Sequence, residues 1–514
     1  MPNTENIAAR LLAKNLERHP DKAAYLCGDD TLTYRALAAD SARFANLLRA
    51  RGVRQGDRVL LVLPDSFAYP KAILGAMFLG AAPVLASTLL TPEDYAFLLQ
   101  DSAASALVTW EDSPAAQGAH LLADTPSLLS VIFSGMDGPW GLGAQSTALE
   151  PAQLTGGGPG FMLYSSGSTG RPKGVPHAQA DLLVPAKGWG TQVLGVSPDD
   201  ILFSASKMSF AYGLEVSLCL ALDLGATAVL YPGKPGPYEL FEVIARHRPT
   251  LFFCVPTLYS MLVRAFEPGK AGETDKVDET GTDLSSLRLC SSAGEALPAP
   301  LCQEWMRLTG VEILDGIGST EAMNVFISNR PGAVRCGASG EVVPGYEARL
   351  VDDAGAEVPD GTPGNLHVRG EGTTRTYWNR PDKTAETMLD GGWLVTGDVY
   401  VRENGVYTHQ GRSDDMMKVG AHWVSPVQVE QALRQHPAIL DCAVAATKVE
   451  GLVRPCAHVV LAPGNEPTQA LARDILTQAR ALLQPYMCPV RLEFHAELPK
   501  TPTGKVQRFR LRGA

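Results

Sequence analysis

The spacing of apolar positions predicts strands that alternate with helices through most of the chain. Short apolar runs bounded by polar or glycine-containing segments have the length of buried strands. They lie at residues 57–64, 82–86, 106–109, 130–133, 161–164, 227–231, 251–257 and 287–292, and the last two are each predicted to enter a loop. Alternating strands and helices are typical of parallel sheets covered by helices, so the pattern predicts an α/β fold.

Near the N-terminus, an apolar residue at every third or fourth position between 7 and 16 predicts a helix. A strand pair is predicted at 24–26 and 31–34. The longest apolar run, 72–86, contains Pro83 and is too short to span a bilayer. We therefore expect a buried helix running into a strand there, and no membrane role.

The pattern changes from Gly337 onward, where short alternating strands indicate a small β-rich unit. These strands are predicted at 346–351, 366–369 and 405–409, and a compact tail follows with helices at 427–434 and 471–482 and strands at 443–445 and 457–461. We place the domain boundary at Asp414. The prediction is a large N-terminal domain (1–413) of layered α/β subdomains plus the β-rich subdomain, and a small α+β C-terminal domain (414–514).

Composition and charge narrow the classes of function. The chain has 514 residues, 45% hydrophobic and 19% charged, which is typical of a globular protein of more than one domain. Its formal net charge of −11 argues against nucleic-acid binding, which needs a basic surface. Nine cysteines without a C-x-x-C pair indicate reduced, buried thiols. Because the N-terminus also lacks the features of a signal peptide, we expect a cytoplasmic protein.

The richest chemistry lies in the segment 164–174, Tyr-Ser-Ser-Gly-Ser-Thr-Gly-Arg-Pro-Lys-Gly. Glycines let a backbone approach an anion, hydroxyls add short donors, and Arg171 and Lys173 add positive charge, so a strand is predicted to end in a phosphate-binding loop. A flexible, solvated loop is the plainer alternative. The segment is not a Walker P-loop, because Pro172 and Gly174 flank the lysine. Nor is it a nucleophile elbow, since Ser166 stands two positions before Ser168.

Four further stretches join this segment, at 315–321, 396–398, 411–414 and 498–505. Each alone is weak, but their order over about 340 residues is hard to ascribe to chance. Together they resemble the adenylate-forming superfamily of acyl-CoA synthetases, adenylation domains and luciferases. The run 210–214, with 294–297 and 411–418, is most similar to benzoate-CoA ligases.

The resemblance implies an ATP-dependent, Mg²⁺-dependent ligase with coenzyme A as a further substrate. A carboxylate would attack the α-phosphorus of ATP to give an acyl-adenylate and pyrophosphate, and the CoA thiol would then displace AMP. Attack of one anion on another needs cations and donors where charge builds up.

The resemblance also implies roles for individual residues. The catalytic residues would be Lys505, Thr320 and Glu321, with Glu321 also the metal ligand; ATP or AMP would be bound by Ser165, Ser166, Gly167, Ser168, Thr169, Gly170, Lys173, Gly294, Glu295, Asp315, Gly316, Asp398 and Arg412. Asp414 would be the hinge about which the small domain rotates. Gly420 and Ala421 would lie at the CoA channel, where Ala421 departs from the family's usual glycine.

The acid pocket would be lined by Phe210, Ala211, Tyr212, Gly318, Asn324 and Val325, with Ala322 and Lys207 nearby. Benzoate-specific relatives typically carry histidine where this chain has Asn324. An asparagine side chain offers both donors and an acceptor, and a buried polar group needs a partner, so a substituted benzoate is favoured. We expect 2-aminobenzoate first, then hydroxybenzoates or benzoate.

Three other readings remain to be weighed. A stand-alone enzyme that loads an aryl group onto a carrier protein would explain Ala421, although no carrier domain follows Ala514. A P-loop NTPase lacks the required Gly-Lys-Ser/Thr. A catalytically silent binding protein is disfavoured by the presence of Glu321, Asp398 and Lys505. We expect small-molecule partners only and a monomer or homodimer.

Overall fold

The chain forms two compact units. The computed structural model describes residues 5–117, 125–133, 141–154, 158–165, 171–266, 283–420, 422–449, 451–500 and 506–512. The first unit comprises residues 1–165, 172–347 and 369–394, and the second comprises 166–171, 348–368 and 395–514. The boundary predicted at Asp414 remains a prediction.

The first unit contains a nine-stranded sheet whose centre is parallel. Its strands, in spatial order, are β15 (Glu341–Val342), β14 (Asn324–Ser328), β13 (Ile313–Ser319), β12 (Leu289–Ser292), β11 (Leu251–Cys254), β9 (Ile201–Ser204), β10 (Thr227–Val229), β1 (Ala23–Cys27) and β2 (Asp30–Thr33). The pairs β13–β14, β14–β15 and β1–β2 are antiparallel. The predicted α/β fold is confirmed.

A six-stranded sheet, also in the first unit, repeats this design. Its strands, in spatial order, are β6 (Ser130–Phe133), β5 (Ala106–Thr109), β3 (Arg58–Leu61), β4 (Ala82–Leu85), β7 (Phe161–Ser165) and β8 (Lys173–His177). All neighbours are parallel except β7 and β8, which form an antiparallel hairpin. The central strands are buried along their whole length, which explains why they read as continuous apolar runs in the sequence.

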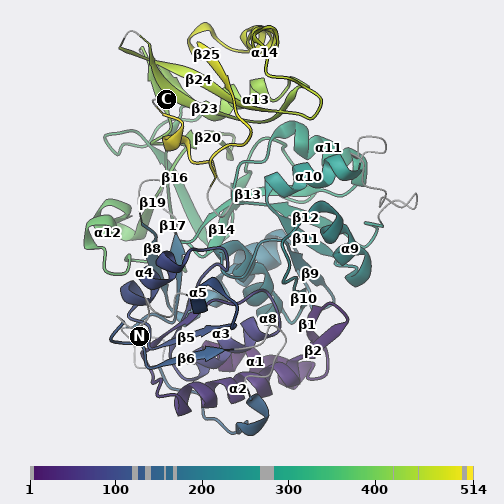
Figure 1. The fold of residues 1–514 in the computed structure, drawn as a ribbon, viewed down its shortest axis with the longest axis vertical. Coiled ribbons are helices and arrows are strands. Elements are labelled where there is room, and N and C mark those ends of the chain that lie inside the picture. The colour runs from purple at the N-terminus through teal and green to yellow at the C-terminus, as the bar shows by residue number, and fades with distance from the viewer. Residues whose placement is uncertain are drawn as a thin grey trace. The chain divides into compact units, whose positions relative to one another are not determined.

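Helices cover these sheets and bury their apolar sides (Figure 1). They are α1 (Ile7–Arg18), α2 (Tyr34–Ala50), α3 (Ala68–Phe78), α4 (Pro92–Ser102), α5 (Pro114–Gln117), α7 (Ala211–Leu214), α8 (Ala221–Leu224), α9 (Pro237–His247), α10 (Pro256–Phe266) and α11 (Ala299–Thr309). The short helix α12 (Pro381–Thr387) buries none of its residues and contacts β18 instead. A π-helical segment, Glu215–Leu220, joins α7 to α8. The predicted buried helix corresponds to α3, where a Cβ on Gly75 would meet the Ser41 carbonyl of α2 at 2.7 Å. Glycine therefore lets α2 and α3 pack closely.

The second unit is smaller and mixed. A three-stranded sheet of β23 (Ile439–Val449), β24 (Leu452–Leu461) and β25 (Arg491–Phe494) packs one face against α13 (Pro426–Leu433) and α14 (Gln469–Leu482). The hairpin of β21 (Met417–Val419) and β22 (His422–Val424) lies before α13. Most residues of the strands β16 (Tyr346–Val351), β17 (Gly364–Gly370), β19 (Trp393–Glu403) and β20 (Val406–Arg412) also belong to this unit, and β19 pairs antiparallel with β20, whereas β18 (Met388–Leu389) belongs to the first unit.

Two details differ from the sequence-based expectations. The segment after β11 is not a loop, because α10 begins at Pro256, directly after the strand. Cys302 on α11 and Cys336 are joined in a disulfide, so the prediction of reduced thiols is wrong for that pair. No local sequence pattern predicts this bond, since the two residues are 34 positions apart and only the fold brings them together. None of the helices that the structure describes is both long and apolar enough to cross a membrane.

Candidate active site

The hairpin β7–β8 places two of the predicted phosphate-binding residues side by side. Ser165, the last residue of β7, pairs with Lys173, the first residue of β8. The hydroxyl of Ser165 is buried and has no hydrogen-bond partner among the described residues. The predicted residues Ser166, Gly167, Ser168, Thr169 and Gly170 lie outside the described part of the chain. The hairpin thus fixes both ends of the predicted loop.

A tyrosine far away in the sequence connects the lysine of this hairpin to the predicted metal ligand. The Lys173 ammonium lies 4.2 Å from the centre of the Tyr377 ring, within the range of a cation–π contact. The Tyr377 hydroxyl donates to Oε1 of Glu321 at 2.8 Å. Tyr377 therefore contacts the Lys173 ammonium through its ring and the Glu321 carboxylate through its hydroxyl. Tyr377 was not among the residues predicted from the sequence.

A buried histidine fixes the residue before that carboxylate. Nε2 of His177, on β8, lies 2.9 Å from the Thr320 carbonyl oxygen, and Nδ1 lies 3.3 Å from the Asp181 carboxylate. The His177 ring also stacks on Phe161 of β7, with 5.1 Å between ring centres. The hairpin that carries Lys173 therefore also positions the turn that carries Thr320 and Glu321. His177 was not among the predicted site residues.

The residues predicted to flank adenine gather at the carboxyl ends of β12 and β13, where ligands bind in open parallel sheets. Asp315 on β13 pairs with Ser292 on β12, and a polar atom of each (Oδ1 and Oγ) is buried without a hydrogen-bond partner among the described residues. Burial raises the pKa of Asp315 well above its usual range. Gly294 follows with φ +92°, a left-handed conformation that glycine adopts most readily. Oε2 of Glu295 accepts a hydrogen bond from Thr257 at 3.3 Å.

The predicted acid pocket contains an aromatic cluster. The Tyr212 ring lies 6.2 Å from Trp189 and 6.3 Å from Phe253, and its hydroxyl donates to Ser291 at 3.1 Å. Phe210 and Ala211 precede it at the start of α7. Lys207, also considered for this pocket, points elsewhere and donates to the carbonyls of residues 231 and 233.

Two glycines on β13 are required by the hairpin that leads into this pocket. A Cβ at Gly318 would lie 2.6 Å from the Asn324 carbonyl oxygen, and a Cβ at Gly316 would lie 2.9 Å from the Ile327 carbonyl oxygen. Gly318 and Val325 are paired in the β13–β14 register. The small residue at Gly318 therefore serves close strand pairing, whatever space it also leaves for a ring.

Asn324, the first residue of β14, is the most unusual member of this group. Its side chain is 2% exposed, yet neither Oδ1 nor Nδ2 makes a hydrogen bond of acceptable geometry with the described residues. The neighbouring Tyr346 hydroxyl is directed instead at the carbonyls of Ala322 and Glu371, 3.0 Å from each. Burial raises the pKa of the Tyr346 hydroxyl and Asn324 beside it partly offsets that shift, so this tyrosine is a polar neighbour of the amide. Leaving a buried polar group without a well-made hydrogen bond costs about 1–3 kcal/mol, so a polar ligand group beside Asn324 would be favourable.

A second buried polar residue near Asn324 was missed by the sequence analysis. Glu215 is 2% exposed, and its Oε1 accepts from the Val325 amide at 3.2 Å. Burial raises the pKa of Glu215 well above its usual range, so the neutral acid, with a hydrogen to donate, is favoured. A sequence signal existed, since Glu215 is the only charged residue between 211 and 222.

The predicted residues of the second unit form their own group. Asp398 on β19 pairs with Arg412 on β20, and Nη1 of Arg412 lies 3.3 Å from both carboxylate oxygens. The His409 ring is 3.5 Å from the same carboxylate. Asp414 is exposed, and its carbonyl accepts from Arg512. Gly420 lies in the turn after β21 with φ +62°, whereas Ala421 and Lys505 fall outside the described residues.

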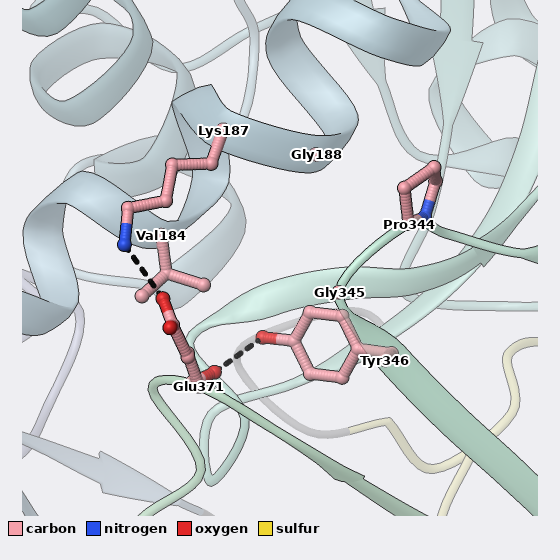
Figure 2. A pocket seen from close by; sticks show the side chains of 7 residues that line it. All are labelled: Val184, Lys187, Gly188, Pro344, Gly345, Tyr346 and Glu371. Carbon is pink, nitrogen blue, oxygen red and sulfur yellow. Dashed lines mark hydrogen bonds and ion pairs between the residues drawn. The ribbon is translucent and has the colours of Figure 1, made fainter.

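A small pocket of about 110 Å³ in the first unit is separate from the predicted residues (Figure 2). Its lining comprises Val184, Lys187, Gly188, Pro344, Gly345, Tyr346 and Glu371. An ion pair of 2.6 Å joins Lys187 to Glu371, and both side chains are more than half exposed. None of the predicted site residues lines this pocket, so we assign it no part in the chemistry.

Comparisons with known proteins agree with this arrangement. The model of the AMP-binding enzyme family matches residues 12–378, and the model of the AMP-binding enzyme C-terminal domain matches residues 428–505. The chain is 41% identical to a benzoate–CoA ligase of Thauera aromatica, over 100% of this chain and 97% of the relative. It is 38% identical to a 4-hydroxybenzoate–CoA/benzoate–CoA ligase of Rhodopseudomonas palustris, over 99% and 94%. A solved anthranilate CoA ligase, AuaEII, in complex with anthranoyl-AMP, superimposes with a TM-score of 0.91 at 39% identity, covering 99% of this chain and 97% of that one.

Comparing the effects on stability of replacing two buried asparagines tests whether the Asn324 side chain lacks hydrogen-bond partners. Asn324→Leu is expected to leave the free energy of unfolding unchanged or to raise it by about 1–3 kcal/mol, because two unpaired polar atoms are removed. The matched control is Asn329→Leu, at a residue that is also 2% exposed. Asn329 bonds Ala338 at 2.7 Å and Arg335 at 2.8 Å, so its replacement should lower stability. Equal destabilisation in urea titrations of both variants would contradict the interpretation.

Proposed function

This chain belongs to the family of AMP-binding enzymes, and from that premise we propose that it is an ATP-dependent aryl-CoA ligase. It activates a benzoate-type acid as an acyl-adenylate with release of pyrophosphate, and CoA then takes the acyl group with release of AMP. The observation that carries the proposal is the convergence of Ser165, Lys173, Thr320 and Glu321 around the β7–β8 hairpin and Tyr377.

The chemistry of the first half-reaction fits these side chains. A carboxylate oxygen forms a bond to the α-phosphorus as the bond to pyrophosphate breaks, so negative charge has to be stabilised on both sides of the phosphorus. Lys173 and the hydroxyl of Ser165 supply a cation and a donor for the pyrophosphate side, and the Thr320 hydroxyl supplies a donor for the α-phosphate. In the second half-reaction the thiol sulfur bonds to the acyl carbon, AMP leaves, and the thiol proton passes to solvent.

Glu321 fits a magnesium ion. A carboxylate beside a phosphate-binding loop would repel the nucleotide, and Mg²⁺ is commonly bound through one or two carboxylates together with substrate phosphates. With Oε1 of Glu321 fixed by Tyr377 at 2.8 Å, the carboxylate is oriented before the metal arrives. The ion would supply charge neutralisation at the phosphates, and Glu321 would hold it.

Residues of the second unit are proposed to act on the nucleotide and on CoA. The Asp398 carboxylate has two oxygens for the two ribose hydroxyls, and Arg412, at 3.3 Å, would hold it in place or meet the phosphate. Lys505 would bridge the substrate carboxylate and the α-phosphate during adenylation, since a compact ammonium on a long stem suits a mobile role. Rotation at Asp414 would then exchange Lys505 for the face that completes thioester formation. Gly420 and Ala421 would border the CoA channel.

The buried polar side chains of the proposed acid pocket favour a ring that carries a polar substituent. Asn324 offers donors and an acceptor at the start of β14, and the carboxyl of Glu215, in the π-helical segment, accepts from the amide of the next residue of that strand, Val325. A ring amino or hydroxyl group would satisfy groups that unsubstituted benzoate leaves unpaired. We therefore propose 2-aminobenzoate as the preferred acid, ahead of hydroxybenzoates and benzoate.

The proposal is tested by pyrophosphate release from ATP and Mg²⁺ in the presence of a panel of substituted benzoates. Release should require an aryl acid, and a thioester should form only when CoA is added. ATP hydrolysis that is indifferent to any carboxylate would overturn the proposal. Accumulation of acyl-adenylate without transfer to CoA would instead favour a carrier protein as the acceptor.

Lys505→Ala should separate the two half-reactions. Loss of one preorganised cation at the α-phosphate is expected to lower the adenylation rate by about 10²–10³-fold, while thioester formation from supplied acyl-adenylate stays largely intact. Lys500→Ala is the matched control, because Lys500 pairs with Asp441 at 2.9 Å and should be dispensable for both steps. Equal loss of both steps in Lys505→Ala would refute the proposed role.

Asn324→His should change which acid is preferred. The imidazole replaces an amide that can donate and accept at once, so kcat/KM for 2-aminobenzoate relative to benzoate should fall by at least about tenfold, the equivalent of one lost hydrogen bond. The measurement is a competition between the two acids under limiting ATP. An unchanged ratio would remove Asn324 from the specificity of the enzyme.

A further inference from the structure

A group of potential metal ligands lies on the three-stranded sheet of the second unit. Cys456 and His458 on β24 and Glu493 on β25 have ligand atoms within 4.8 Å of one another, and no other such group occurs among the described residues. Cys456 and His458 are both 1% exposed. His495 stands directly after β25, with Nε2 3.0 Å from Nδ1 of His458 and 3.9 Å from the Glu493 carboxylate.

Strand register explains why these side chains meet. His458 pairs with Glu493, and the His495 amide donates to the Val459 carbonyl, so the parallel pairing continues past the end of β25. Ala457, Val459, Leu492 and Phe494 face the helices α13 and α14 in the core. Since side chains alternate between the faces of a sheet, Cys456, His458, Glu493 and His495 all point to the opposite face.

The surroundings suit a small, closed site. On the neighbouring strand β23, Ala445 pairs with Cys456 and Ala443 pairs with His458, so only methyl groups border the cluster on that side. Leu498 and Leu511 pack on the same two alanines. Nε2 of His458 is buried and has no hydrogen-bond partner among the described residues. The other ring nitrogen, Nδ1, faces the cluster, 3.0 Å from Nε2 of His495 and 3.5 Å from the Glu493 carboxylate, so Nδ1 is the atom that would bind an ion.

We propose that Cys456, His458, Glu493 and His495 form a binding site for a zinc-like divalent transition metal ion, which cross-links β24 to β25. A thiolate, two imidazoles and a carboxylate form a donor set that favours Zn²⁺ over Mg²⁺ or Ca²⁺, which take oxygen ligands. Tetrahedral zinc bonds place ligand atoms roughly 3.3–3.8 Å apart, so the cluster needs to contract only slightly. The site is separate from the Mg²⁺ ligand proposed at Glu321, and it does not depend on the proposed function.

Replacing Arg491 tests whether its positive charge opposes metal binding at this cluster. Its guanidinium now lies 2.6 Å from the Glu493 carboxylate, where it neutralises part of the negative charge that a metal would use. The side chain is 51% exposed, so it can turn to solvent when an ion binds. Arg491→Gln should therefore strengthen metal binding, by at most about fivefold, as expected for an exposed ion pair.

The experiment is a titration of the reduced, chelator-treated full chain with ZnCl₂ against a competing chromophoric chelator. Wild type should bind one tight equivalent, and Cys456→Ser and His495→Gln should each weaken it by at least about tenfold, since even outer-sphere changes cost that much. Cys488→Ser is the matched control, as a free cysteine outside the cluster, and should bind like wild type. Co²⁺ should give a thiolate-to-cobalt absorption band that Cys456→Ser loses and Cys488→Ser retains.

Each result of the titration either supports or overturns the proposed metal site. Absence of a tight equivalent in wild type, or equal binding by Cys456→Ser and Cys488→Ser, would overturn the proposal. Circular dichroism of the metal-free variants shows whether each one is folded, and His495→Gln, at a side chain that is 29% exposed, keeps the test valid if Cys456→Ser does not fold. Pyrophosphate release measured in parallel reports on the ligase activity independently, so failure of one proposal is distinguishable from failure of the other.

Discussion

The candidate site depends on one constraint, which is that β13 changes partner halfway along its length. Its first residues pair in parallel with β12, whereas from Gly316 onward it pairs antiparallel with β14. The strand thereby extends beyond the carboxyl edge of the parallel sheet and carries a turn into the space where ligands of α/β proteins bind. Thr320 and Glu321 lie in that turn, Asp315 lies before it, and Asn324 lies after it. Without side chains at positions 316 and 318 the two strands can approach closely enough to hold this geometry.

Rigid contacts from distant segments then fix the turn. His177 holds the Thr320 carbonyl, Tyr377 holds the Glu321 carboxylate, and the Thr374 amide donates to the Glu321 carbonyl at 2.7 Å. All three bonds are made within the chain, so the contacts that order the turn do not depend on a ligand, which lowers the cost of binding. Preorganisation of this kind is what electrostatic catalysis requires, because donors that must first reorient stabilise a transition state less.

The sequence predicted what depends on local pattern and missed what depends on long-range contact. The runs at 82–86 and 106–109 were recognised as strands because every residue in them is buried, and the motif order identified the superfamily. Strand β8 was missed, since Lys173-Gly-Val-Pro-His has neither alternation nor a continuous apolar run. His177 and Tyr377 act only through partners 143 and 56 residues away, which no local pattern reveals. The Cys302–Cys336 bond was missed for the same reason.

The proposed phosphate-binding residues and the polar residues of the proposed acid pocket differ in solvent exposure. This difference separates the residues that would recognise the ring from those that would activate the carboxylate. Lys173, Thr320 and Glu321 are partly exposed, which suits highly charged phosphates that keep some of their water. Asn324 and Glu215 are each 2% exposed, so an unmatched group there incurs the full desolvation penalty. Discrimination among rings is therefore expected to rest on burial, whereas activation of the carboxylate rests on charge. Because the proposed function assigns the two tasks to separate residues, it implies that the acid accepted can change while the residues assigned to the phosphates stay the same.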